Sequence, residues 1–293
     1  MTPPTLPTDA TVGAANAAEA GASPSAADLG RGGAWQAVAA VARNAFREAI
    51  RDRVLFSLLF FAVLMVGAAV LFSQMSFGIS AASLVNFSLA AITVLGVILA
   101  VFLGNQLVSK EMERRTLYTL LAHPVRRTHF LLGKFAGLAA TVAVNCGLMG
   151  VALLLALAYI LPAHWAPGEA AVIAAVYLIL LALGVLTAIA LLFSCFASPV
   201  MAALFSLALF IIGNFDGSLR ALGHTAHNRW GGHVAVALAA VLPNFGIFNI
   251  ATAAAHFEPI AWRLIGLDTL YAVVYSAVAL VIAGAIFAHR DLK

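Results

Sequence analysis

The chain has 293 residues, of which 63% are hydrophobic and 10% charged, with a formal net charge of +4. Soluble domains carry about 25% charged residues, so this composition excludes an ordinary soluble protein and indicates an all-α integral membrane protein. The basic residues flank apolar runs and do not gather on a soluble domain, which argues against nucleic acid as a partner.

Residues 1–33 are rich in Ala, Pro, Thr, Ser and Gly and have no apolar periodicity. This composition predicts a disordered tail that precedes a transmembrane domain over residues 34–293. A signal peptide would begin with a basic region followed by an apolar one, and neither occurs here. The tail is therefore expected to be cytoplasmic.

Residues 34–53 follow a helical pattern with one apolar and one basic face. The apolar face is predicted to contain Trp35, Val38, Ala42, Phe46 and Ile50. A basic amphipathic helix that leads into a membrane span is typical of an interfacial helix on the inner leaflet. The alternative is a helix that packs against another part of the protein.

Six apolar runs are predicted as membrane spans, for which about 20 helical residues cross the ~30 Å hydrocarbon core. They cover approximately residues 54–73, 84–107, 130–161, 170–196, 200–215 and 264–288. Ser198 and Pro199 predict a tight turn between the fourth and fifth of them.

The region 216–262 between the last two spans is punctuated by Gly, His, Asn and Pro. Its apolar run, His233–Leu242, is too short to span and predicts a re-entrant or outer interfacial helix. His224, His227 and His233 are interpreted as polar residues of an outer loop. A metal site stays open as an alternative, although no Cys or paired carboxylate completes a ligand set.

The distribution of basic residues predicts the orientation. Twelve are expected on one side, namely Arg43, Arg47, Arg51, Arg53, Lys110, Arg114, Arg115, Arg126, Arg127, Lys134, Arg290 and Lys293. Only Arg220, Arg229 and Arg263 are expected on the other side. The positive-inside rule then places both termini and the loop around residues 109–129 in the cytoplasm of a cell inner (plasma) membrane protein.

That loop is the longest polar segment between two spans, and it predicts a short cytoplasmic helix. Ser109 is expected to cap it, with Glu111 and Glu113 in its first turn, where the helix dipole favours anions. Pro124 is expected to end it, and Thr128 to cap the next span. The spacing of three leucines gives this helix an apolar face formed by Leu117, Leu120 and Leu121.

The same loop resembles the signature of permease subunits in the type-2 exporter class of ABC transporters. The matching residues are Glu111, Glu113, Thr116, Leu117, Leu120, Leu121, Pro124, Val125 and Arg127, followed by Leu132, Gly133 and Lys134. Arg115 and Arg126 depart from the Gly and Ser that are usual there. A weaker match to the end of the same six-span, NosY-like permeases covers Leu242, Pro243, Asn244, Phe245, Phe248 and Asn249, then Phe287, Arg290, Asp291 and Leu292.

The resemblance implies that the loop is a coupling helix that docks on a separate ABC ATPase. Its coupling residues would be Glu111, Glu113, Thr116, Leu117, Leu120, Leu121, Pro124 and Arg127. It also implies a partner permease, as a homodimer or a heterodimer, in contact with membrane lipid. The expected function is the membrane-spanning subunit of an ATP-driven exporter. The alternatives are a membrane anchor or assembly factor that transports nothing, and a secondary transporter.

The chemistry that the sequence lacks supports a separate energy source. Gly133 and Lys134 do not form a P-loop, because the upstream glycine and the following Ser or Thr are missing. We therefore expect no catalysis and no cofactor in this chain, with ATP bound by the partner. No predicted span has a central charged residue, which argues against an ion-driven carrier. Asn86, Asn105 and Asn145 are expected to form hydrogen bonds between helices.

Overall fold

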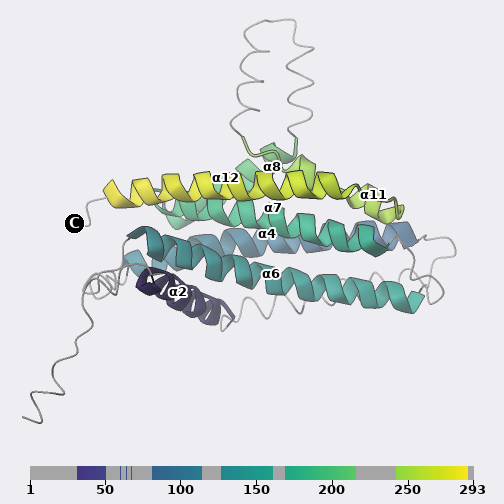
Figure 1. The fold of residues 1–293 in the computed structure, drawn as a ribbon, viewed down its shortest axis with the longest axis horizontal. Helices are drawn as coiled ribbons and strands as arrows, with labels where there is room; N and C mark the ends of the chain where they lie inside the picture. Colours follow the sequence, from purple (N-terminus) through teal and green to yellow (C-terminus); the bar gives the residue numbers. More distant parts are fainter. Residues whose placement is uncertain are drawn as a thin grey trace, which may run out of the picture.

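The structure, a computed structural model, describes residues 32–50, 60, 64, 67, 81–113, 127–160, 169–215 and 242–289. In these ranges the secondary structure is helical, without strands. The elements are α2 (Gly32–Ile50), α4 (Ala81–Glu113), α6 (Arg127–Ile160), α7 (Glu169–Ser194), α8 (Pro199–Asn214), the 3₁₀ turn η1 (Gly246–Phe248), α11 (Ala251–Ala255) and α12 (Trp262–His289). The long helices form a bundle, with α2 along one side of α6 (Figure 1).

In the described part of the chain, four helices are long and apolar enough to cross a membrane: α4, α6, α7 and α12. They correspond to the second, third, fourth and sixth predicted spans. The fifth corresponds to α8, whose 16 residues fall short of the ~20 needed to cross a bilayer. The first predicted span falls almost wholly outside the described residues, as does the proposed re-entrant run 233–242.

Helix α7 occupies the centre of the bundle and packs against α4, α6, α8 and α12 (Figure 1). Its buried residues lie on all sides, and Leu178, Leu183, Leu186 and Leu191 are almost completely inaccessible. A helix that is apolar around its whole circumference can pack on several sides without burying an unpaired polar group. Helix α12 instead lies at the periphery, where residues such as Leu270 and Val281 are exposed.

Two glycines bring α4 close to α7. A Cβ atom at Gly104 would lie 2.6 Å from the Cβ atom of Ala190, and one at Gly96 would overlap the side chain of Leu183. The contacts advance along both helices in the same direction, so α4 and α7 run parallel. Small residues of this kind let helix backbones approach closely in membranes, where packing has to replace the hydrophobic effect.

Helix α8 begins at the turn that the sequence predicts at Ser198 and Pro199, with Ser198 in the N-cap position and Pro199 at the first helical position. At its other end, Gly213 leaves no room for a side chain, because a Cβ atom there would overlap the carbonyl oxygen of Pro243. The backbone N–H of Phe245 donates a hydrogen bond of 3.0 Å to the Gly213 carbonyl. The end of α8 is therefore fixed to the segment that leads into η1.

Candidate functional site

The polar loop begins differently from the prediction. Helix α4 continues without a break from Ala81 to Glu113, so Ser109 lies inside this helix and does not cap a new one. Glu111 and Glu113 therefore occupy the last turn of α4, and the prediction that they lie in a first turn was wrong. Anions at a helix C-terminus oppose the macrodipole, at a cost of about 0.3–1 kcal/mol each. The helix extends eight residues, or ~12 Å, beyond the apolar span that ends at Asn105.

Helix α6 begins at Arg127, so Thr128 lies in its first turn and is not its cap. Of the predicted coupling residues, Glu111, Glu113 and Arg127 belong to described helices. Thr116, Leu117, Leu120, Leu121 and Pro124 lie outside the described residues, as does most of the predicted coupling helix.

The two helix ends that flank residues 114–126 lie at the same level of the bundle. Gly96 of α4 faces Cys146 of α6, with 3.2 Å between a Cβ atom built at Gly96 and the sulfur. From this contact, Glu113 lies ~26 Å further along α4 and Arg127 ~28 Å back along α6, at 1.5 Å per residue. Helix α6 runs antiparallel to α7, and therefore to α4, because Gly150 meets Val176 whereas Cys146 and Leu183 both meet Gly96. The nearly equal distances thus bring Glu113 and Arg127 to the same end.

Helix α2 packs against the first part of α6, so it matches the alternative of a helix that contacts the rest of the protein. Cβ atoms at Gly133 and Gly137 would lie within 2.5–2.8 Å of the backbone carbonyl oxygens of Val38 and Ala42. Ala45 and Ala49 of α2 are buried, whereas Trp35, which was predicted on the apolar face, is 71% exposed. The packed face is thus rotated away from Trp35.

The small-residue pattern Gly133-x-x-x-Gly137 is the signal that sequence reasoning missed. It explains the glycine of the Leu132-Gly133-Lys134 part of the signature, because any side chain there would push α2 away. Lys134 next to it is 98% buried, with Nζ 5.3 Å from the centroid of the Phe130 ring. A cation over an aromatic face is stabilised by the ring quadrupole. The start of α6 is therefore a tightly packed junction.

The C-terminal motif forms a second junction, between α8 and α12. The Phe245 ring lies 5.0 Å from that of Phe210, and Phe248 lies 6.1 Å from Tyr271. The backbone N–H of Asn244 donates to the Tyr271 hydroxyl oxygen at 2.9 Å, and the Ala251 N–H donates to Asn249 Oδ1 at 3.3 Å. The motif residues thus hold the chain between the end of α8 and the start of α11.

The histidines proposed as an alternative metal site, His224, His227 and His233, lie outside the described residues. In the region that the structure describes, no three His, Cys, Asp or Glu side chains come close enough to hold a metal. His256, further along the predicted outer side, has its Nδ1 atom 2.9 Å from the carbonyl oxygen of Thr252 in its own helix.

A family model described as "ABC-2 family transporter protein" matches residues 39–229, which is more than half of the chain. The chain belongs to the ABC-2 transporter family. The match includes the larger part of α2, all of α4, α6, α7 and α8, and the whole polar loop. No curated protein matches the sequence.

As an ABC-2 family member, the chain is a multi-pass membrane protein and the permease component of an ABC transporter, and its family works with an ABC ATPase subunit. The permease family is itself a transport component and not a catalyst. The junction between α2 and α6 and the junction between α8 and α12 are therefore parts of the permease component of a transporter. The first of them, formed by α2 and the start of α6, lies next to the segment that resembles the coupling helix.

Proposed function

We propose that this chain is the membrane subunit of an ATP-driven exporter that couples to a separate ATPase through residues 109–129. The observation that carries the proposal is the continuity of α4, which runs as one helix from the bundle to Glu113. The thirteen residues that follow connect it directly to α6. A force applied to this segment would act on the two spans that it joins, α4 and α6.

The position of α2 supports the same proposal. Its backbone contacts at Gly133 and Gly137 fix it to the first three turns of α6. A movement imposed on the start of α6 would therefore carry α2 with it. In the proposed cycle, ATP closes the ATPase dimer, residues 114–126 move, and the spans rock between inward-open and outward-open states. The work comes from the different affinities of ATP for the two states.

We also propose that both termini and the coupling segment are cytoplasmic, in a six-span subunit that pairs with a second permease in the cell inner membrane. Charge asymmetry supports the orientation. Broad apolar surfaces support the pairing and lipid contact, for example Val144, Leu148, Val151 and Leu155 along one stripe of α6. Without central charges, the pathway between two such subunits would accept amphipathic cargo in preference to small ions.

The decisive experiment tests the leucine face of the coupling segment. Leu120→Asp should abolish capture of the ATPase and transport, because truncating a buried anchor costs about 2 kcal/mol or more. Glu111→Ala should weaken capture less, since exposed ion pairs contribute about 1 kcal/mol or less. Membrane insertion and thermal stability of each variant serve as the controls.

Two outcomes would reject the proposal. If Leu120→Asp inserts normally and retains both ATPase and transport, the segment is not the coupling element. If the wild-type chain captures no ATPase and its loop binds vesicles with anionic lipids instead, the anchor or assembly-factor alternative holds.

A further inference from the structure

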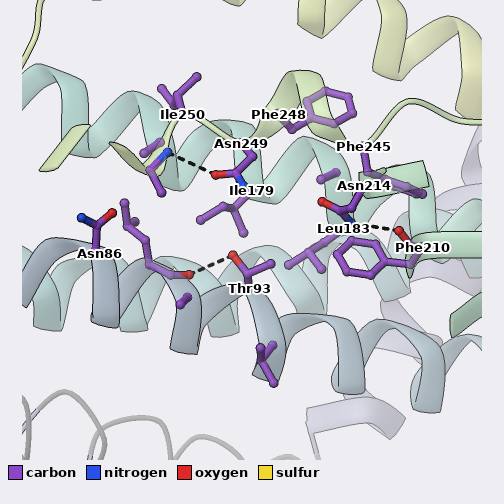
Figure 2. Close-up of a pocket in the computed structure, with 16 residues that line it drawn as sticks. Asn86, Thr93, Ile179, Leu183, Phe210, Asn214, Phe245, Phe248, Asn249 and Ile250 are labelled. Atoms are coloured by element: carbon purple, nitrogen blue, oxygen red, sulfur yellow. Dashed lines mark hydrogen bonds between the residues drawn. The ribbon is translucent and has the colours of Figure 1, made fainter. Parts of the chain in front are cut away.

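A cavity of about 340 Å³ lies within a single chain, at the end of the bundle opposite the coupling segment. It is lined by α4, α7, the end of α8 and the segment from η1 to α11 (Figure 2), and it opens to the outside of the bundle where Ala90 and Val94 are exposed. Its position between helices of one subunit distinguishes it from a pathway between two subunits. Volumes of about 300–1,000 Å³ are typical of small-molecule sites.

The inner wall of this cavity is apolar. Leu89 of α4, Leu183 of α7, and Phe245 and Phe248 of the C-terminal motif are all buried and face it. None of the described residues that line it is charged. At ~30 Å³ for each water-sized group, the space holds roughly ten non-hydrogen atoms. An uncharged, apolar group of about that size therefore matches the lining of the cavity.

Three carboxamides supply the polar part of the lining, at Asn86, Asn214 and Asn249 (Figure 2). Asn214 donates through Nδ2 to the Phe210 carbonyl oxygen at 2.9 Å, and Asn249 accepts through Oδ1. The other half of each amide remains for a ligand. The side-chain amide of Asn86, five positions into the apolar helix α4, forms no hydrogen bond with any residue that the structure describes.

Between Asn86 and Asn214, the cavity is lined by a hydroxyl group that already forms a hydrogen bond. Thr93 donates to the carbonyl oxygen of Leu89 at 2.8 Å (Figure 2). From Asn86 to Val94 the lining extends along α4 by ~12 Å, at 1.5 Å per residue. The cavity is thus elongated, with side-chain amides at both ends, Asn86 at one and Asn214 at the other (Figure 2).

We propose that this cavity binds a neutral amphiphile. Its alkyl or aryl body would lie against Leu89, Leu183 and Phe248, and its uncharged polar head would hydrogen-bond to the asparagine amides. A charged head is disfavoured, because burying an ion without a partner of opposite charge costs far more than burying a hydroxyl or an amide. The site belongs to one subunit and does not depend on coupling to an ATPase.

The test uses the full chain in lipid nanodiscs and photolabelling by decanol that carries a mid-chain diazirine. Labelled peptides are located by mass spectrometry. We expect saturable labelling of residues 86–94 or 245–251, at least about tenfold stronger than with the matching decyl sulfate or decyltrimethylammonium probes. Labelling that does not saturate, or that is equal for all three probes, would overturn the proposal.

Two variants test the apolar part and the polar part of the site separately. The first, Ala90→Phe, tests the apolar part. Ala90 lines the cavity and is exposed to it, so Ala90→Phe fills the space and should reduce labelling by about tenfold or more. Its matched control is Ala140→Phe, at an exposed position of α6 that lines no cavity. Unchanged melting temperatures for both variants show that the fold is retained. Equal labelling of the two would reject the cavity as the binding site.

Asn86→Leu keeps the volume but removes the amide. Labelling by the decanol probe should fall about three- to tenfold, the change expected for one hydrogen bond, while a diazirine-bearing decane should label as before. If the decanol signal is unchanged, the polar contact is refuted. Leu120→Asp should leave the labelling intact, so failure of the coupling proposal and failure of this one are distinguishable.

Discussion

A Cβ atom added at Gly137 of α6 would lie 2.5 Å from the backbone carbonyl oxygen of Ala42 in α2. Real Cβ atoms essentially never come this close, so the two backbones are in direct contact only because residue 137 has no side chain. The neighbouring atoms there are backbone and the Cβ atom of Ala45, none of which can rotate away. The junction between α2 and α6 therefore depends on glycine at this position.

The first prediction follows from this contact. Gly137→Leu should lower the free energy of unfolding by at least about 1–3 kcal/mol, because an inserted side chain overpacks the junction. Gly147→Leu in the same helix is the matched control, since a Cβ atom there meets nothing within 4 Å. Thermal unfolding of both variants in the same detergent provides the measurement. A Gly137 variant as stable as the control would contradict the close packing.

A second prediction concerns the hydrogen bond between Asn244 N–H and the Tyr271 hydroxyl. Tyr271→Phe leaves a partly buried backbone donor without its acceptor and should cost about 1–3 kcal/mol. Tyr159→Phe is the control, because Tyr159 is 73% exposed near the end of α6. Unfolding in denaturant compares the two. Equal midpoints would show that solvent replaces the Tyr271 hydroxyl at no cost.

The third prediction concerns Phe257, whose φ of 55° places a non-glycine residue in the left-handed region. It follows α11, where the N–H groups of Phe257 and Glu258 donate to the carbonyls of Ala254 and Ala253. This is the Schellman pattern, which favours glycine at this position. Both Phe257→Ala and Phe257→Gly lose the packed ring, but the Gly variant should be about 1 kcal/mol more stable than the Ala variant.

The comparison of those two variants isolates the backbone strain, because they differ by one methyl group. At an ordinary helical position the order is reversed, with Ala more stable than Gly by about 1 kcal/mol. Ala140→Gly at the exposed site on α6 supplies that reference. Melting temperatures that rank Ala above Gly at position 257 would refute the strained conformation.

The fourth prediction tests the topology. Single cysteines at Ser109 and Ser218, in a background that lacks Cys146 and Cys195, should react with an impermeant thiol reagent from opposite sides of the membrane. Cys146 and Cys195 are free thiols that are both buried, each about 1% exposed. Replacing them by Ala leaves the introduced cysteine as the one thiol that the reagent can label. Labelling of both new cysteines from the same side would refute the proposed orientation.

Local signals in the sequence predicted part of the fold correctly. The long apolar runs correspond to α4, α6, α7 and α12, because about 20 apolar residues in a row have few other stable environments. The Ser198–Pro199 start of α8 was also predictable, since an N-cap followed by proline acts through its own backbone. These features depend on neighbouring residues alone.

Features that depend on contacts across the fold were not predicted. Ser109 resembles an N-cap, yet capping competes with the continuation of a helix that tertiary packing already supports, and here α4 continues. The packed face of α2 is set by Gly133 and Gly137 of another helix, which the periodicity of α2 cannot reveal. The cavity at Asn86 brings together four segments from a stretch that extends from Asn86 to Ala251, so no local pattern indicates it.

The burial of α7 has a consequence for biogenesis. During synthesis α4 and α6 enter the membrane first, and the surfaces that α7 later covers, including those around Gly96 and Gly104, face lipid until it arrives. A ribosome-bound chain that ends before residue 169 is therefore an incomplete bundle with an open groove. Membrane quality-control proteases should recognise such a chain, and insertion of α7 is the step at which the nascent protein becomes resistant to them.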